Sequence, residues 1–455
     1  MVEAMHRGME RWAQRADAAR LPVGRVVREA LRAMEAGGLA DADPDEIAEV
    51  VGRDPALTLH LLSSANSVEH LHLDNEVGTI RHAALMLGTA RIFPMAQALP
   101  VDEEALTGEA LAGYRRAAAR ARRAGVLARD WAGWRGDQLP DEVYAAALAA
   151  FAGELAAWAW EPEGMVQVEA MMADGIASED AEYLALGCAL VRLSSLLAYL
   201  WSLPPLALQA LEPANALQPR PYGVMLAVEL ARALERGWGS RAARQALAEA
   251  AAWIELPVAE LEARAQETLA EAGLAVPEAA EPRGPAVPYL LAPRPDLFRQ
   301  ALAALGEAGA TPLDAAVELA LDALHDGLGL NRVVFARLVR HGEALRAHRF
   351  RGTEHSPAFN RFELPLWGGH LFSRLVEEGG CLRVCKEDAE RWSEVPEAVR
   401  ELVQVPVFLA AAVRGRGGTV GLLYADRRFP EAPIRDVDLE RFAEVVTALE
   451  AALAR

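Results

Sequence analysis

Side chains of metal-ligand type stand close together early in the chain. The segment EHLHLD contains His70, His72 and Asp74, which would share one side if this stretch were extended. Imidazole and carboxylate groups can bind a divalent cation, and the bound cation can activate a water molecule to attack a phosphate ester. His60 and His82 are near in sequence and could complete such a set. Because a metal site needs converging ligands with supporting partners, we favour a solvated connection and keep this site as an alternative.

The cysteines and the nucleophile motifs point away from other chemistry. Cys381 and Cys385 lie in CLRVC, whose composition is typical of a strand with both thiols on one side. With no histidine cluster beside them, we expect two half-buried side chains. Together with Cys188 they cannot form a disulfide framework in 455 residues, which suits a reducing cytoplasm. The sequence has no G-x-S-x-G elbow, no P-loop and no G-x-G-x-x-G after a strand, so we expect no catalytic residues and no cofactor.

Capped helices are expected to position the early histidines. Asp54 is followed by proline, a combination that starts a helix because the carboxylate accepts free backbone N–H groups and proline suits the first turn. Asp43 precedes a second such start, with Gly52 as the expected C-cap. Thr79 can cap a third helix over residues 80–87.

These helices resemble the HDOD family (the HD-related output domain). Its typical run is an acidic-Pro start and a leucine-rich helix ending in Asn-Ser, which here reads GRDPALTLHLLSSANS over residues 52–67. HAALMLG (82–88) is similar to a second family segment, and WSLP (201–204) to a later "W-x-LP" signpost. The resemblance covers roughly residues 15–215 and implies an all-α domain.

The resemblance also implies where metal ligands would stand in related HD phosphohydrolases, which use a His, a His-Asp pair and a further Asp. The chain has no histidine between His82 and His325. Ala150 and Phe151 occupy the expected register of the pair, and Leu190 replaces a later histidine. None of these three side chains can coordinate a metal. The His-Asp dipeptide that begins at His325 lies far downstream, where chance and helix capping explain it.

The composition changes after the helical region. Between Pro277 and Pro295 the chain contains six prolines without helical or strand periodicity, which predicts an extended linker. We therefore expect an all-α domain over 1–273, a linker over 274–295 and an α+β domain over 296–455. The elements expected in the last domain begin with a helix whose apolar stripe covers 313–324 and which ends at Gly327 or Gly329. Strands are expected over 332–340, 344–352, 405–415 and 419–427, and a closing helix from Leu439 is expected to cover a sheet or to meet a partner helix.

The C-terminal part resembles a GAF domain. A glycine-led strand from Gly421 to Asp426 is followed by Asp436 and Asp438 before the last helix, as in that family. The resemblance implies a central antiparallel sheet and a small-molecule pocket, although the cyclic-nucleotide signature N-K-x-x-F-x-x-x-D-E is missing. Aromatic surface with a few polar tips is typical of such pockets. The candidate ligand-binding residues are Arg337, Arg349, Phe362, Trp367, His370 and Tyr424.

Charge and hydropathy limit the partners. The formal net charge of −19 disfavours nucleic acid and anionic membranes. The most apolar stretch, Val143 to Trp160, is interrupted by Glu154 and predicts a buried helix rather than a membrane span. The N-terminus lacks the apolar core of a signal peptide, so we expect a cytoplasmic protein. A basic cluster is expected to be a solvated helix face: Arg115, Arg116, Arg120, Arg122 and Arg123.

The sequence thus predicts a multidomain, bacterial-type signal-transduction protein without catalytic activity. A degenerate HD-type domain without metal ligands would be coupled to a GAF-like domain that binds an unknown small molecule or forms a homodimer, and protein partners are expected. One alternative is a metal-dependent phosphohydrolase with atypical ligands drawn from His60, His70, His72 and Asp74. The other is a structural adaptor whose GAF-like pocket is filled by side chains.

Overall fold

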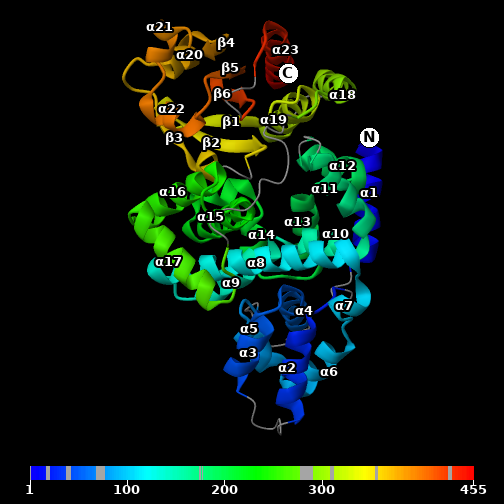
Figure 1. The fold of residues 1–455 in the computed structure, drawn as a ribbon. Coiled ribbons are helices and arrows are strands. Elements are labelled where there is room, and N and C mark those ends of the chain that lie inside the picture. Colours follow the sequence, from blue (N-terminus) through cyan, green and yellow to red (C-terminus); the bar gives the residue numbers. More distant parts are fainter. Residues whose placement is uncertain are drawn as a thin grey trace. The chain divides into compact units, whose positions relative to one another are not determined.

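The chain folds into two compact units. The computed structural model describes residues 2–16, 21–36, 43–67, 77–173, 176, 178–276, 291–307, 312–353, 357–428 and 433–454 (Figure 1). The first unit comprises residues 1–174 and 181–284, and the second comprises 175–180 and 285–455. The change of unit after residue 284 falls within the expected linker, of which residues 277–290 lie outside the described part. The assignment of residues 175–180 to the second unit was not predicted from the sequence.

The described part of the first unit is built from helices. They vary from a single turn to the long helix that runs through the unit (Figure 1). Their bounds are α1 Val2–Arg15, α2 Arg25–Ala36, α3 Pro44–Gly52, α4 Pro55–Asn66, α5 Ile80–Leu87, α6 Thr89–Ala98, α7 Asp102–Ala105, α8 Gly108–Trp134, α9 Pro140–Ala149, α10 Ala152–Trp160, α11 Pro162–Ala173, α12 Ser178–Leu186, α13 Leu190–Leu200, α14 Pro205–Ala210, α15 Pro219–Ala233, α16 Arg241–Ile254 and α17 Val258–Glu271, with 3-10 turns η3 Pro213–Leu217 and η4 Leu234–Arg236.

The predicted helix starts are confirmed. Asp54 accepts a hydrogen bond from the N–H of Leu57 at 2.9 Å, and its other oxygen accepts one from the N–H of Gly24 at 2.6 Å. Burial raises the pKa of this carboxyl, although both hydrogen bonds oppose the shift. Thr79 caps α5 in the same way. The predicted C-cap of α3 is wrong by one residue, because Gly52 is the last helical residue and Arg53 is the cap.

The apolar stretch is buried, but it forms two helices rather than one. α9 and α10 meet at Ala150 and Phe151, and the backbone leaves the helical conformation at Phe151. Over the described residues, Pro140–Trp160 is long and apolar enough to cross a membrane, and 83% of an apolar 18-residue window within it is buried inside the protein. A bent pair, α12 with α13, passes the same test of length and composition only if both helices are counted as one span.

A six-stranded antiparallel sheet forms the centre of the second unit. Its strand order is β3-β2-β1-β6-β5-β4. The predicted strands over 332–340, 344–352, 405–415 and 419–427 are confirmed within a few residues. The bounds are α18 Pro295–Glu307, α19 Leu313–Asp322, η5 Ala323–Gly327, β1 Arg332–Val339, η6 Arg340–Gly342, β2 Ala344–Arg351, η7 Pro357–Arg361, β3 Glu363–Pro365, α20 Leu371–Glu378, β4 Cys381–Cys385, α21 Ala389–Ser393, α22 Glu397–Val403, β5 Val407–Gly415, β6 Gly418–Asp426 and α23 Asp436–Ala454.

The two faces of this sheet have different coverings. Phe335 on β1 is paired with Leu423 on β6, and both join an apolar core with residues of α18, α19 and α23. Neighbouring residues such as Tyr424 point to the opposite face because side chains alternate along a strand. The apolar seam predicted for the closing helix packs into the core that contains Phe335 and Leu423, with Phe442 and Leu449 buried there. The helix α23 therefore covers this face of the sheet.

The cysteines lie as the sequence predicts. Cys381 and Cys385 are half-buried at the two ends of the edge strand β4, and Cys188 is buried in the first unit. Burial raises the pKa of the Cys188 thiol to about 12, with a smaller contribution from Glu182. Burial also raises the pKa of Cys381 to about 11.

We expect native Cys188 to react about 1000-fold more slowly with a disulfide reagent than an ordinary thiol. A raised thiol pKa lowers the reactive thiolate fraction at pH 8, and a shift from 9.0 to about 12 is a factor of about 1000. Stopped-flow titration of the folded chain measures this rate. The control is the same titration in denaturant, where the three thiols should react alike, and a fast native Cys188 would contradict the burial described here.

Candidate functional site

The region where an HD-type metal pair would stand is closely packed. Ala150 and Phe151 sit at the junction of α9 and α10 with exposures of 7% and 0%. The guanidinium of Arg232, on α15, lies 5.3 Å from the centre of the Phe151 ring. The ring of Phe151 and the guanidinium of Arg232 therefore fill this position together. Neither Ala150 nor Phe151 has a side-chain atom that could coordinate a metal.

Leu190 and Gly153 show how closely α10 and α13 approach each other here. The hydroxyl of Ser194 on α13 donates to the carbonyl of Ala150 at 3.0 Å and accepts from the N–H of Gly153 at 2.9 Å. A Cβ atom on Gly153 would lie 2.4 Å from the carbonyl oxygen of Leu190. The Ser194 hydroxyl and the close contact between the backbones of α10 and α13 therefore leave no space at this junction.

At Glu154, the residue after Gly153 on α10, charged side chains form a network that was not predicted from the sequence. Arg120 on α8 donates two hydrogen bonds to Glu154, at 2.7 and 2.9 Å, and Arg123 pairs with Glu235 at 3.0 Å. The side chains of both arginines are less than 20% exposed. Burial opposes the charged form of Arg120, but Glu154 and Glu235 raise its pKa. The expectation of a solvated basic face is therefore wrong for Arg120 and Arg123.

The alternative histidine site is only partly described. His60 lies on α4 and His82 on α5, both half-buried. His70, His72 and Asp74 lie outside the described residues. A metal site built from this set stays a prediction.

The candidate ligand residues of the second unit are not brought together. Arg349 is paired with Phe335 on the face covered by α19, opposite to the face of Tyr424. A β-bulge on β2 re-aims its side chains, so that His348 and Arg349 both contact the carboxylate of Asp314, at 2.9 and 3.0 Å. The expectation that Arg349 and Tyr424 line one pocket is therefore wrong.

Of the remaining four candidates, Arg337 lies on the central strand β1 and the other three lie in connections around β3 and α20. Arg337 is exposed, Phe362 is half-buried before β3, and Trp367 is 79% exposed in a turn. His370 caps α20, because its Nδ1 accepts from the N–H of Ser373 at 3.2 Å while Nε2 contacts the carbonyl of Pro365 at 2.8 Å. Ligand binding by these residues remains a prediction.

Aromatic side chains fill the sheet face opposite the core that contains α18, α19 and α23. Phe408 and Tyr424 project from β5 and β6, with ring centres 5.2 Å apart. Phe359 from η7 packs on Tyr424 at 5.7 Å, and Phe372 from α20 stacks on Phe408 at 6.2 Å. All four are at most 6% exposed. The rings of the protein itself thus occupy this face.

A buried ion pair lies beside the rings. Arg332 donates to the carboxylate of Asp426 at 2.7 and 3.0 Å and to the carbonyl of Val403 at 2.7 Å. The hydroxyl of Tyr424 donates to the same carboxylate, and the guanidinium lies 4.3 Å from the centre of the Phe359 ring. Burial, followed by the charge of Asp426, raises the pKa of Tyr424 well above its usual range. Asp426 was predicted only as the end of the Gly421–Asp426 strand. Its pairing with Arg332 was not predicted, because the alternation of residues along a strand does not indicate which partner each side chain meets.

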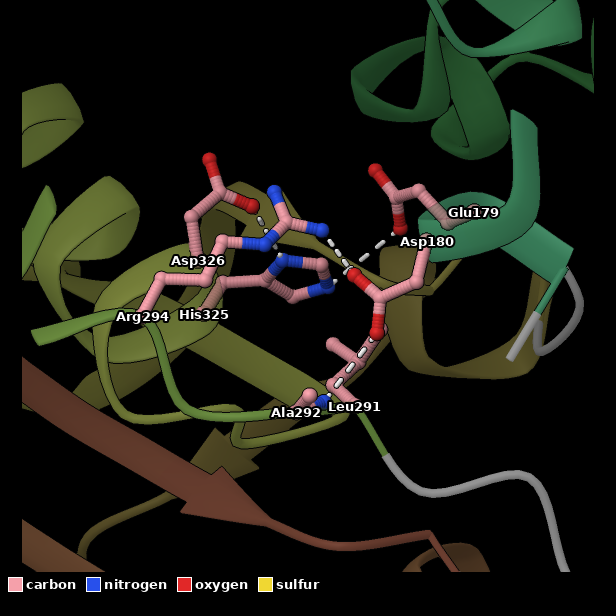
Figure 2. Close-up of a pocket in the computed structure, with 7 residues that line it drawn as sticks. All are labelled: Glu179, Asp180, Leu291, Ala292, Arg294, His325 and Asp326. Atoms are coloured by element: carbon pink, nitrogen blue, oxygen red, sulfur yellow. Dashed lines mark hydrogen bonds and ion pairs between the residues drawn. The ribbon is translucent and has the colours of Figure 1, made fainter. Parts of the chain in front are cut away.

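Charged residues around η5 form the second cluster that the sequence missed. Figure 2 shows Glu179, Asp180, Arg294, His325 and Asp326 gathered around one small pocket, and all five belong to the second unit. His325, 2% exposed, has Nδ1 at 3.0 Å from Asp326 and Nε2 at 3.7 Å from Glu179. Asp180 accepts from Arg294 and from the N–H of Ala292.

This cluster contains ligand types for a cation but already carries compensating charge. Donor atoms of Glu179, His325 and Asp326 lie within 4.8 Å of one another, which by residue type could hold a divalent ion. Burial opposes ionisation of Asp326, but His325 and the nearby Arg294 hold its pKa below the ordinary value. The ion pairs and hydrogen bonds hold residues 178–180 against residues 291–294, two segments that are remote in sequence. This structural role explains the cluster.

Comparison with known families identifies the helical part. Residues 24–216 match the family model of the HDOD domain. They include the Asp54-capped helix and the α9–α10 junction, so the expected resemblance over the helical region is confirmed and this stretch is an HDOD domain. A search of curated proteins gives no match.

Solved structures similar to the chain include proteins of different kinds. A virulence factor from Campylobacter jejuni subsp. jejuni is 16% identical with a TM-score of 0.47, covering 60% of this chain and 100% of that chain. The MmoQ response regulator from Methylococcus capsulatus str. Bath is 20% identical with a TM-score of 0.44, covering 54% and 97%. A GAF domain/HD domain protein from Geobacter sulfurreducens is 15% identical with a TM-score of 0.27, covering 33% and 95%. At these scores the likenesses support no conclusion about function.

Proposed function

We propose that this chain is a non-catalytic regulatory protein of bacterial signal transduction, whose HDOD domain acts by binding partners. The observation that supports the proposal is the packed α9–α10 junction, where Ala150 and Phe151 stand in the register at which the family resemblance implies a metal-binding pair. Phe151 is fully buried under Arg232, and Ser194 bridges the backbone beside it. Side chains without donor atoms cannot hold the cation that activates water in an HD-type reaction.

We further propose that the second unit is a GAF-like domain that works without a bound small molecule. The Gly421–Asp426 strand, the acidic start of α23 and the antiparallel sheet support the GAF-like assignment. The packed rings of Phe359, Phe408 and Tyr424 favour a structural or dimerisation role over a ligand pocket. A metabolite that raises the melting temperature of the full chain by several degrees would contradict this part of the proposal.

The catalytic question can be decided on the full chain. We expect protein purified without chelator to hold less than about 0.1 equivalent of transition metal and to hydrolyse no model phosphodiester above the buffer rate, because the HD positions lack ligands. Elemental analysis and a phosphodiesterase assay with added Mg²⁺, Mn²⁺ or Zn²⁺ measure both quantities.

The rival phosphohydrolase makes the opposite prediction. It would contain stoichiometric metal, and turnover would disappear in His72→Ala while the exposed control Glu10→Gln stayed active. This combination would overturn the non-catalytic proposal. Turnover that survives His72→Ala would instead require an active site at other residues and would equally contradict it.

A further inference from the structure

His325 is a buried side chain with a carboxylate beside each of its ring nitrogens. It is 2% exposed, and Figure 2 shows its ring between Asp326 and Glu179. The distances are 3.0 Å from Nδ1 to Asp326 and 3.7 Å from Nε2 to Glu179. A neutral imidazole donates from one nitrogen only, whereas an imidazolium donates from both. The two carboxylates therefore favour the protonated form of His325.

The backbone around His325 holds the imidazole in this position. In η5 the N–H of Leu328 donates to the carbonyl of Ala323, five residues earlier, at 3.1 Å, so this turn is π-helical. Such turns are rare and are often found at functional sites. A Cβ atom on Gly352 would lie 2.8 Å from Nε2 of His325, so the segment after β2 encloses that side of the ring. The charge of the imidazolium is therefore compensated by protein groups rather than by water.

The charged groups around His325 leave an excess of negative charge when the imidazole is neutral. Glu179 and Asp180 contribute two carboxylates from the first turn of α12. Asp326, on η5 itself, contributes a third. The guanidinium of Arg294, just before α18, is paired with Asp180. A proton on His325 therefore offsets part of this negative charge.

Asp326 stays ionised while His325 titrates. Burial opposes ionisation of this carboxyl, but the hydrogen bond and the charge of His325 hold its pKa below the ordinary value. The charges of Arg294 and Arg351 act in the same direction. Arg351, on β2, has its ion-pair partners on α19: Glu318 and Asp322. The proton that is lost as the pH rises therefore comes from the imidazole.

We propose that His325 is a pH switch, which holds the first turn of α12 when it is protonated and releases that turn when it is neutral. The imidazolium attracts Glu179, and the next residue, Asp180, accepts from Arg294 and from the N–H of Ala292. Histidine changes its charge between about pH 5 and 8. Because the folded cluster favours the protonated form, its stabilisation is complete at low pH and is lost as the pH rises. The switch is independent of whether the protein is an enzyme.

Hydrogen exchange of the full chain, read by mass spectrometry on peptides covering 178–186 and 291–300, tests the switch. The N–H groups of 182–184 close the first turn of α12, so their exchange reports its opening. With EDTA present and intrinsic rates corrected, we expect protection to fall about tenfold between pH 6 and pH 8. His325→Gln should abolish this change. The matched control His348→Gln should retain it, because His348 contacts Asp314 and not α12.

A second variant covers loss of folding in His325→Gln. Glu179→Gln removes one of the two carboxylates at a side chain that is 34% exposed, and circular dichroism verifies that the chain remains helical. We expect its change in protection to shrink to about threefold or less. Protection that does not depend on pH in the wild-type chain overturns the proposal. A tenfold change that persists in Glu179→Gln, or in folded His325→Gln, overturns it as well.

Discussion

Alanine at position 153 is expected to destabilise the HDOD domain by about 3 kcal/mol. The new Cβ would lie 2.4 Å from the carbonyl oxygen of Leu190 and 2.7 Å from the backbone nitrogen of Ser194. Backbone atoms cannot step aside alone, so α10 and α13 must separate, and overpacking of this kind costs about 1–3 kcal/mol or more. Separation also stretches the hydrogen bond from Gly153 to the Ser194 hydroxyl. Urea unfolding of the full chain, followed by far-ultraviolet circular dichroism, measures the loss.

The matched control is Gly133→Ala on α8. No atom lies within 4 Å of the Cβ that it would add, and alanine favours a helix by up to about 1 kcal/mol over glycine. We expect this control to be neutral or slightly stabilising. Equal unfolding curves for the two variants would show that α10 and α13 are not packed as described.

Removing the carboxylate of Asp426 should destabilise the second unit by about 3–5 kcal/mol. Asp426→Ala leaves the guanidinium of Arg332 buried without its charge partner, and Asp426 and Arg332 are 0% and 3% exposed. Hydrogen exchange of the full chain, read by mass spectrometry on peptides from β1 and β6, locates the loss within the second unit.

Two further variants separate the buried charge from a general effect of substitution. Asp436→Ala removes a carboxylate that is 84% exposed in its pair with Arg383, and it should change stability by less than about 1 kcal/mol. The double variant Arg332→Met with Asp426→Leu should recover much of the loss, because an apolar pair needs no compensation. If the Asp426→Ala and Asp436→Ala variants show the same hydrogen-exchange rates in β1 and β6, the guanidinium of Arg332 is not buried against Asp426 as described.

Local signals in the sequence predicted most elements correctly. The Asp54 and Thr79 caps depend on contacts three residues away, and the strands of the second unit follow from short apolar runs, so neighbouring residues determine both. The family resemblance located the HDOD domain for a similar reason, because the family's sequence motifs lie in continuous segments such as 52–67.

Contacts between remote segments could not be predicted in this way. The bulge at His348 changes which side chains share a face, and it sends Arg349 to Asp314 instead of to a pocket with Tyr424. Arg120 looks solvated from its own helix, because its partners Glu154 and Glu235 come from distant parts of the chain. Such positions depend on tertiary packing, which the local spacing of residues does not encode.

The bridge made by Ser194 means that no single substitution at Ala150 or Phe151 would create a metal site at the α9–α10 junction. An imidazole at position 150 has no room, since that residue is 7% exposed and its carbonyl is tied to the Ser194 hydroxyl. Replacing Phe151 with a carboxylate residue would remove the aromatic ring that fills the core at this position. The new carboxylate would form an ion pair with Arg232 instead of binding a metal cation. Building a metal site here would require coordinated changes on α10, α13 and α15, because Phe151, Ser194 and Arg232 together fill the junction.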